Sequence, residues 1–163
     1  MPGRDREDGD GTDREDEDGT DREDGDGTDR AGDADPSYDP ETRAMGHPID
    51  PNALMIAAAK ASVGAGRLPE LLRAADEHLR GHLDEYERAY ECVDEGADRG
   101  AVTFLVPEGH WKEIGDELGV NRREVDALRR AHEQHLLRVG TQRRRRREFE
   151  SALELREAVV VGR

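Results

Sequence analysis

Four histidines lie at spacings that metal ligands use. His78 and His82 are four residues apart, and His132 and His135 are three residues apart. On a helix, such intervals place both imidazoles of a pair on one face, as two zinc ligands require. If the two helices pack together, the four imidazoles can converge, with Glu85 or Cys92 nearby. However, neither stretch has the HExxH arrangement, and charged residues flank both pairs, as they flank surface histidines. We therefore expect no metal site.

The acidic repeat near the start has some features of a calcium site. Residues 5–28 repeat one eight-residue unit three times, with a single Gly→Glu exchange. A calcium loop needs oxygen ligands at its first, third and fifth positions, a glycine at the sixth and an acid at the twelfth. When Asp8, Asp10 and Gly11 take the third, fifth and sixth positions, an acid falls at the twelfth but Arg6 falls at the first. A guanidinium cannot ligate a cation, and no apolar helix flanks any copy. We expect a solvated, disordered tail without calcium.

The stretch WKEIGDELGVNRREVDAL, residues 111–128, has the features of a tight corner between two helices. Gly119 can adopt the left-handed conformation that ends a helix, and Asn121 can cap the next one. Apolar side chains on both sides of Gly119 recur at helical spacing, so the two helices can pack against each other. These side chains are Ile114, Leu118, Val120, Val125 and Leu128.

This stretch resembles the helix-turn-helix motif of DNA-binding proteins, which has a small residue where Gly115 stands. The resemblance covers about 20 of 163 residues, and alanine is commoner than glycine at the small position. It implies double-stranded DNA as a partner, with the second helix in the major groove. There, arginine reads guanine and asparagine reads adenine. The implied contact residues are Asn121, Arg122, Arg123, Asp126 and Arg129.

A run of five arginines follows the second helix of the corner. Such a run can bind phosphates without reading sequence. Two of its members have a glutamate four residues later, so ion pairing along a helix surface is an alternative use for part of the run. The run consists of Arg143, Arg144, Arg145, Arg146 and Arg147.

The corner also admits a purely structural interpretation. Any tight corner between helices needs a glycine, a cap and apolar residues at this spacing, whether or not DNA is near. Glu124, Asp126 and the acidic leader would repel phosphates. The sequence therefore leaves open a DNA-binding corner and a structural one.

The elements that would position these residues are mostly helical. Asp50 and Pro51 form a helix start, and AVTFLVP at 101–107 has the β-branched, apolar character of a short strand. The segment AVVVG near the end can remain helical or pair with that strand. Helices are expected at 51–63, at 68–95 with a break at most near Gly81, at 110–118, at 121–139 and from about 142 to 157. Gly140 is expected to end the helix at 121–139.

The predicted fold class is mainly α. We expect a small helical domain at 48–163, with a helix-turn-helix-like corner and at most one short β-ladder. It follows an acidic, low-complexity, disordered tail at 1–47. Residues 1–50 contain 19 acidic and 6 basic side chains, whereas residues 51–163 contain 21 and 19, within a net charge of −15. The first 37 residues offer only Met1 and two alanines as apolar side chains, so they cannot contribute to a core.

Composition also bears on the setting of the protein. Cys92 is the only cysteine, which excludes an internal disulfide and favours a reducing interior. The longest nearly apolar run, at 54–63, contains Lys60 and is too short to cross a bilayer. We expect a cytoplasmic protein outside the membrane. With 23 arginines, 2 lysines and abundant carboxylates, the composition resembles that of proteins from salt-loving archaea, so we expect a halophilic protein.

No catalytic pattern stands out. The sequence has no nucleophile motif, phosphate loop or dinucleotide fingerprint, and SVGAGR at 62–67 lacks the lysine and preceding strand of a phosphate loop. We expect neither an enzyme nor a bound cofactor. The first hypothesis is a small nucleic-acid-associated or regulatory protein that uses the helix-turn-helix-like corner. The alternative is a helical interaction module, binding a second copy or another protein through the long helix at 68–95.

Overall fold

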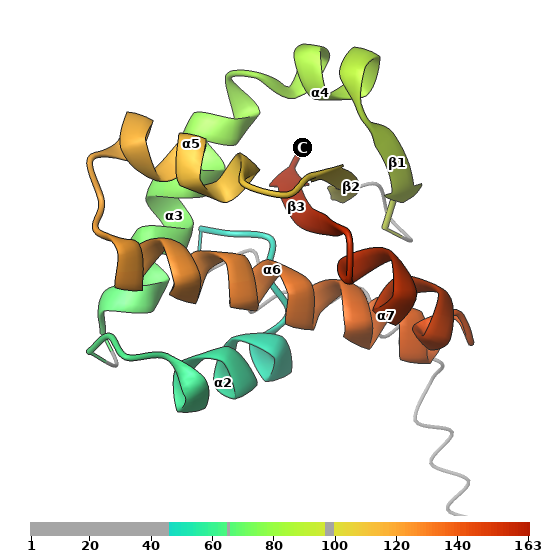
Figure 1. The fold of residues 1–163 in the computed structure, drawn as a ribbon, viewed down its shortest axis with the longest axis horizontal. Helices are drawn as coiled ribbons and strands as arrows, with labels where there is room; N and C mark the ends of the chain where they lie inside the picture. The colour runs from blue at the N-terminus through green and yellow to red at the C-terminus, as the bar shows by residue number, and fades with distance from the viewer. Residues whose placement is uncertain (1–45, 65, 97–99) are drawn as a thin grey trace, which may run out of the picture. The chain divides into compact units, whose positions relative to one another are not determined.

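The computed structural model describes residues 46–64, 66–96 and 100–163. Most of the expected tail, residues 1–45, lies outside the described residues. The described part is mainly helical with a small antiparallel sheet, as the sequence predicts (Figure 1). Its helices are α2 (Pro51–Lys60), α3 (Arg67–Arg80), α4 (Leu83–Ala89), α5 (His110–Leu118), α6 (Arg122–Gln142) and α7 (Arg146–Leu153). Its strands are β1 (Glu91–Asp94), β2 (Ala101–Pro107) and β3 (Arg156–Gly162).

Helix α2 begins as its sequence predicts. The Asp50 carboxylate accepts hydrogen bonds from the backbone N–H groups of Asn52 (2.8 Å) and Ala53 (3.1 Å), and Pro51 occupies the first turn. These contacts satisfy two N–H groups that have no partner within the helix. The helix ends at Lys60, however, and not at 63, because the backbone is already extended at Ala61.

The helix expected at 68–95 forms as far as Ala89, with a break at Gly81 and His82 that this expectation allowed, but the expectation is wrong beyond Ala89. The chain leaves the helix at Gly81 and His82, resumes it as the short α4, and becomes extended from Tyr90 onwards. Residues 91–94 then form β1, which pairs with β2. The helical spacing of apolar residues continues through this region, so the local pattern does not show where pairing with a distant strand takes over.

The sheet has the order β1–β2–β3, and both pairings are antiparallel. Strand β3 pairs with β2 without interruption, from Ala101 opposite Gly162 to Pro107 opposite Arg156. The AVVVG segment therefore pairs with the earlier strand. Strand β1 adds a second ladder, with a bulge between Cys92 and Asp94. The sheet therefore has one ladder more than the single ladder that the sequence allowed for.

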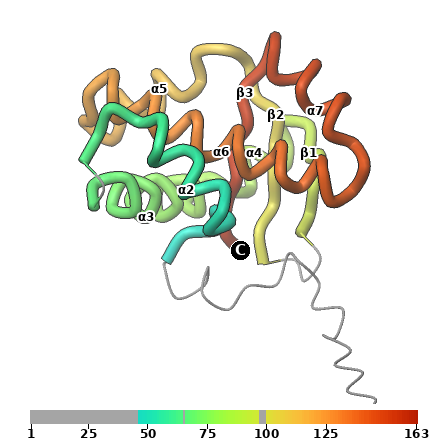
Figure 2. Tube along the Cα trace, turned by 90° about the horizontal axis from the view of Figure 1, so that it is seen from below, coloured from blue at the N-terminus to red at the C-terminus, as the bar shows by residue number. Residues whose placement is uncertain are grey.

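Helix α6 runs through the centre of the described fold and contacts α2, α3, α5, α7 and β3 (Figures 1 and 2). Its buried side chains belong to both core clusters. Leu128 lies in the larger cluster, with α2, α3, α5 and the sheet, and Leu136 lies in the smaller one, beside Phe149 of α7. A helix covered on several sides positions both of its ends firmly.

The sequence indicated that Gly140 ends the helix, but this is wrong, because Gly140 lies inside α6. A Cβ atom at this position would be 2.8 Å from Phe149 Cδ2 and 3.0 Å from Arg146 Cα. The glycine therefore permits the close approach of α7 to α6. The helix ends two residues after Gly140, and Arg144 takes the left-handed conformation with a φ of 58°.

Candidate nucleic-acid interface

The corner between α5 and α6 forms as the sequence predicts. Gly119 has a φ of 67°, and the N–H of Val120 donates to the carbonyl of Gly115 at 3.0 Å. Asn121 then caps α6: its side-chain oxygen accepts from the N–H groups of Arg123 (3.0 Å) and Glu124 (3.1 Å). The Glu124 carboxylate completes the capping box by accepting from the Asn121 N–H at 3.0 Å.

Gly115 sets how closely the two helices of the corner approach. A Cβ atom at this position would lie 2.2 Å from Cγ2 of Val125 on α6. That separation is far below van der Waals contact, so an alanine fits only if the Val125 side chain or the helices shift. The departure from the commoner alanine is therefore explained: this corner is packed more tightly than one that admits a methyl group.

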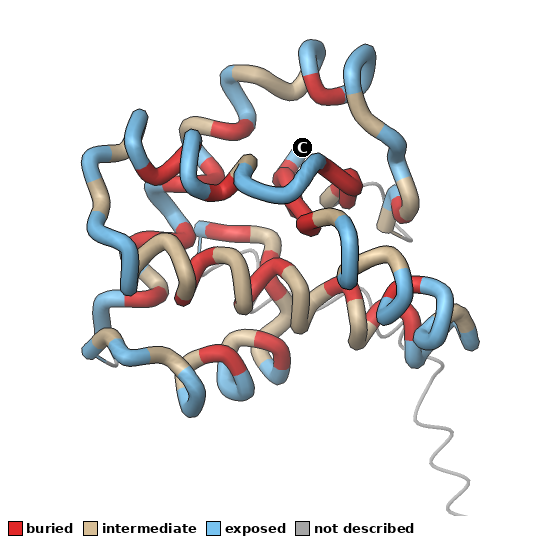
Figure 3. The backbone as a smooth tube through the Cα atoms, in the orientation of Figure 1, coloured by how far each residue is buried: buried red, intermediate tan, exposed pale blue. Residues whose placement is uncertain are grey.

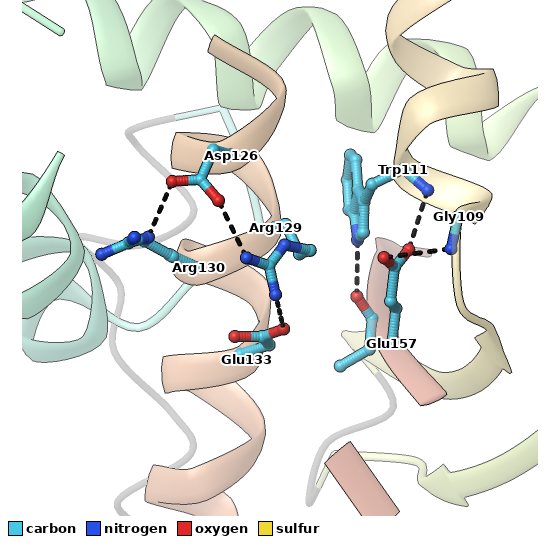
Figure 4. Close-up of polar contacts among 8 residues, drawn as sticks. Gly109, Trp111, Asp126, Arg129, Arg130, Glu133 and Glu157 are labelled. Carbon is cyan, nitrogen blue, oxygen red and sulfur yellow. Dashed lines mark hydrogen bonds and ion pairs between the residues drawn. The ribbon is translucent and has the colours of Figure 1, made fainter. Parts of the chain in front are cut away.

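Strand β3 holds α5 in place through Glu157. The Glu157 carboxylate accepts hydrogen bonds from the N–H groups of Gly109 (3.2 Å) and Trp111 (2.9 Å), at the start of α5 (Figure 4). The Trp111 indole N–H donates to the Ala158 carbonyl at 2.9 Å, and its ring lies 4.4 Å from that of His132 on α6. The start of α5 is therefore bound to both the sheet and α6.

Two predicted contact residues lie on the exposed first turn of α6. Arg122 and Arg123 are exposed, and neither side chain has an ion-pair or hydrogen-bond partner within the described ranges. Asn121 lies beside them, but its side-chain oxygen is engaged by the cap. These two arginines are therefore the predicted contact residues of this turn that are free to bind a partner.

Glu124, which was expected to repel phosphates, has its charge balanced within the protein. Arg67 of α3 contacts its carboxylate at 2.8 Å. The hydrogen bond from Arg67, and then the one from the Asn121 backbone, lower the pKa of Glu124. The carboxylate is therefore ionised, but it is paired with a cation from another helix and engaged in the cap.

The next turn of α6 carries a network of four charged side chains (Figure 4). Asp126 contacts Arg129 at 2.8 Å and Arg130 at 2.9 Å, and Arg129 also contacts Glu133 at 2.8 Å. Burial alone would raise the pKa of Asp126, but the two guanidinium groups outweigh burial and lower it. Burial raises the pKa of Glu133 despite its contact with Arg129. Arg129 and Asp126 are thus bound to each other along the helix surface.

An open groove of about 850 Å³ lies beside this surface. Lys112 and Trp111 of α5 line one side, and Arg122, Arg123 and Arg129 of α6 line the other. Lys112 contacts Asp116 at 3.3 Å, and both side chains are largely exposed. The carboxylates near the groove are thus paired or hydrogen-bonded, and the two unpaired charges at its rim are cationic.

The arginine run lies at the opposite end of α6, and the structure does not bring it beside the corner (Figure 1). The 21 residues of α6 place the two ends about 30 Å apart. Most of the run is already paired: Arg143 contacts Asp94 at 2.8 Å, Arg145 contacts Glu148 at 2.6 Å, and Arg146 contacts Glu150 at 2.8 Å. Within the described ranges, only Arg144 and Arg147 of this run have exposed side chains without a partner.

The two histidine pairs do not converge. On α3, His78 contacts Glu117 of α5 at 2.7 Å. The pair on α6 is not at the surface, contrary to what its charged neighbours indicated: His132 is 1% exposed, and His135 is half-buried. No three metal-binding side chains come close enough to share an ion in the part of the chain that the structure describes.

His47, which the sequence did not single out, is buried near the α6 histidines. The Nδ1 atoms of His47, His132 and His135 accept hydrogen bonds from the backbone N–H groups of Ile49, Val160 and Asp50. Burial is the main reason that the pKa of His47 and of His135 falls to about 4, and that of His132 well below its usual value. The imidazoles are therefore neutral, with the proton on Nε2. The spacing of the histidines within α6 could not reveal His47, which lies 85 residues before His132 in the chain.

The fold and the corner define a mainly helical domain with a helix-turn-helix-like element. Residues 47–163 match a protein-family model described as Domain of unknown function (DUF8048). Because this match covers more than half of the chain, the protein belongs to that family. No curated protein and no solved structure matches the chain. No helix within the described ranges is long and apolar enough to cross a membrane.

Proposed function

We propose that this protein binds double-stranded DNA through the α5–α6 corner, as a small regulatory protein without catalytic activity. One observation carries the proposal. Arg122 and Arg123 are exposed and unpaired on the first turn of α6, whereas nearby Glu124 and Asp126 are paired with arginines of the protein itself. The corner thus presents a local positive charge on a chain whose net charge is −15.

The position of the two arginines suits base recognition. In helix-turn-helix proteins, residues near the N-terminus of the second helix reach base edges in the major groove. Arginine binds guanine there through two hydrogen bonds. Asn121, by contrast, serves as the helix cap, and Asp126 and Arg129 stabilise the helix surface. The proposed base-contacting set therefore narrows from the five residues of the motif to Arg122 and Arg123.

Phosphate contacts come from a second location. Arg144 and Arg147 are the unpaired members of the run at the far end of α6. Their separation of about 30 Å from the corner is close to one helical turn of B-DNA. In the proposed complex, a duplex that follows α6 meets both arginine pairs. In this arrangement, the first pair reads bases and the second fixes the duplex through its backbone.

Fluorescence anisotropy with random and genomic duplex fragments tests this proposal. The full chain should bind at low salt. The double variant R122A/R123A should bind its preferred sequence more weakly, by about 1–3 kcal/mol for each base that an arginine no longer reaches. Arg88→Ala is the matched control, because Arg88 is exposed on α4 and its side chain binds only a backbone carbonyl. Equal affinities for the double variant and the wild type would contradict the proposal.

The alternative, an interaction module that assembles through the long helix, has less support, because the apolar side chains of α3 that it would use are buried. The apolar side chains of α3 face the core and are covered. A face that is already buried cannot also bind a partner without unfolding. These buried side chains are Leu68, Leu71, Leu72, Ala75 and Leu79.

A further inference from the structure

The groove between α5 and α6 has the size of a site for a small molecule. Its volume of about 850 Å³ lies within the range of about 300–1,000 Å³ that such sites occupy. It extends to Gly109, where an added Cβ atom would meet no heavy atom of the described chain within 4 Å, apart from the adjoining residues. Ser62, in the loop after α2, also lines it. The groove is therefore open at this end, and α5, α6, β3 and the loop all contribute to its walls.

The charge changes along the groove. Arg122 and Arg123 lie at the corner end, exposed and without a partner in the described ranges, whereas residues 124–140 of α6 are half-buried or buried (Figure 3). At the other end lies the Glu157 carboxylate, which is bound to two backbone N–H groups at the start of α5. The nine residues of α5 separate the two ends by about 13 Å. A negatively charged group of a ligand is therefore favoured at the corner end alone.

Between the two ends, part of the wall is apolar. Val120 and Val125 line the groove, and both side chains are only half-buried, so water covers the rest of their surface. Arg129 also lines this part, but its guanidinium is bound to Asp126 and Glu133. An apolar group placed along the valines would remove this water and gain free energy. A bare phosphate ion would leave the valines uncovered.

We propose that the groove binds a small organic anion. Its carboxylate, sulfonate or phosphate group contacts Arg122 and Arg123, and its aromatic or aliphatic body lies along Val120 and Val125. Guanidinium groups suit the first contact, because their planar array of N–H donors matches the oxygens of such anions. A cationic ligand would instead meet two unpaired charges of its own sign.

The bound anion would also regulate the contact with DNA. An organic anion and a duplex require the same two arginines, so each excludes the other. The affinity for a duplex should therefore fall as the groove fills. This regulatory consequence rests on the proposed function, whereas the binding of the anion does not.

Two fluorescent probes of similar shape test the binding. Anilinonaphthalene sulfonate carries a sulfonate, and phenylnaphthylamine lacks it. Titrated into the full chain, the sulfonate should bind one per chain and at least about tenfold more tightly than the neutral probe, as hydrogen bonds to charged groups require. The double variant R122A/R123A should bind the sulfonate only as tightly as the neutral probe, whose own affinity should not change. Arg88→Ala, the matched control, should alter neither affinity.

Two further measurements show where and how the sulfonate binds. The indole N–H of Trp111, the only tryptophan, should shift in NMR spectra on binding, because Trp111 lines the groove. Near-ultraviolet circular dichroism should keep its native form, since the sulfonate also binds chains that have lost their packing. Equal affinities for the two probes, an unchanged affinity in R122A/R123A, no shift at Trp111 or loss of the native dichroism would overturn the proposal.

Competition with a duplex separates this proposal from the proposed function. In the anisotropy assay, the sulfonate should displace bound duplex from the full chain in proportion to its occupancy of the groove. Sulfonate binding by a chain that binds no duplex would support the anion site and contradict the proposed function alone. Simultaneous binding of the sulfonate and a duplex would overturn the regulatory consequence.

Discussion

At the scale of single residues, Glu157 shows how a carboxylate beside a groove can be structural. Its two oxygens accept from the backbone N–H groups of Gly109 and Trp111, and its side chain is almost completely covered. The pairing of β2 with β3 places Glu157 next to the start of α5. Glu157 therefore does for α5 what Asn121 does for α6, although it lies 46 residues beyond the N–H that it binds most closely.

Replacing Glu157 tests this assignment. Glu157→Ala leaves the buried N–H of Trp111 without an acceptor, which should lower the free energy of unfolding by about 1–3 kcal/mol. Glu157→Gln keeps one acceptor oxygen and should cost less. Urea unfolding followed by the fluorescence of Trp111, the only tryptophan, measures both changes. Equal stability of the alanine variant and the wild type would show that the cap contributes nothing.

The lowered pKa values of His47, His132 and His135 predict a dependence of stability on pH. His47 and His135 have a folded-state pKa of about 4, below the ordinary value of 6.5, so the unfolded chain binds more protons between these values. Their contribution to stability is therefore complete above about pH 6.5 and is lost as the pH falls towards 4. The loss should approach about 1.4 kcal/mol per pH unit for each histidine.

A comparison of variants isolates this contribution from that of the carboxylates. His135→Gln keeps an acceptor for the Asp50 N–H but cannot be protonated in this range. Its free energy of unfolding should fall less steeply than that of the wild type between pH 6.5 and 5. Urea unfolding at several pH values measures the two slopes. Parallel slopes for the variant and the wild type would show that His135 titrates alike in the folded and unfolded chains.

At the scale of elements, the tight approach of α5 to α6 depends on one missing methyl group. Gly115→Ala would place a Cβ atom 2.2 Å from Val125 Cγ2. The resulting displacement should cost about 1–3 kcal/mol in thermal or urea unfolding. Val125→Ala in the same chain removes the obstructing methyl group and should restore part of the loss. If Gly115→Ala alone is as stable as the wild type, the helices are not held at the observed separation.

The sequence predicted those helices and strands whose ends are set by neighbouring residues in the chain. Asp50 and Asn121 identified two helix starts, Gly119 identified the corner, and β2 was evident from its composition. The sequence did not reveal β1, because Glu91–Asp94 becomes extended only by pairing with β2. Gly140 was misinterpreted as a helix end because a glycine that ends a helix and one that admits a neighbouring helix look the same in the sequence.

The candidate site was predictable to a similar extent. The sequence correctly placed Arg122 and Arg123 at the start of a capped helix, since the cap is a local feature. It could not show which arginines are already paired. Arg67 reaches Glu124 from α3, and Arg143 reaches Asp94 from beyond α6. Such pairings depend on the folded arrangement, and they reduce ten candidate contact residues to four unpaired arginines.

At the scale of the whole molecule, the charge is concentrated in the part that offers the least apolar surface. The first 37 residues hold almost no side chains that can contribute to a core. Deleting residues 1–40 should therefore leave the melting temperature of the remaining chain nearly unchanged, and millimolar calcium should not alter the spectrum of the full chain. Calorimetry and NMR measure these effects. A melting temperature lowered by several degrees, or new amide dispersion on calcium addition, would contradict this expectation.

The salt dependence of duplex binding tests the central claim most directly. The logarithm of the binding constant should fall linearly with the logarithm of salt concentration, by about 0.9 for each phosphate neutralised. The double variant R144A/R147A should bind every sequence more weakly and lower this slope by about 2. R122A/R123A should instead lose the preference for one sequence over another. If the wild-type chain shows no duplex binding at low salt, or if both double variants match its slope and preference, the corner is structural and does not bind DNA.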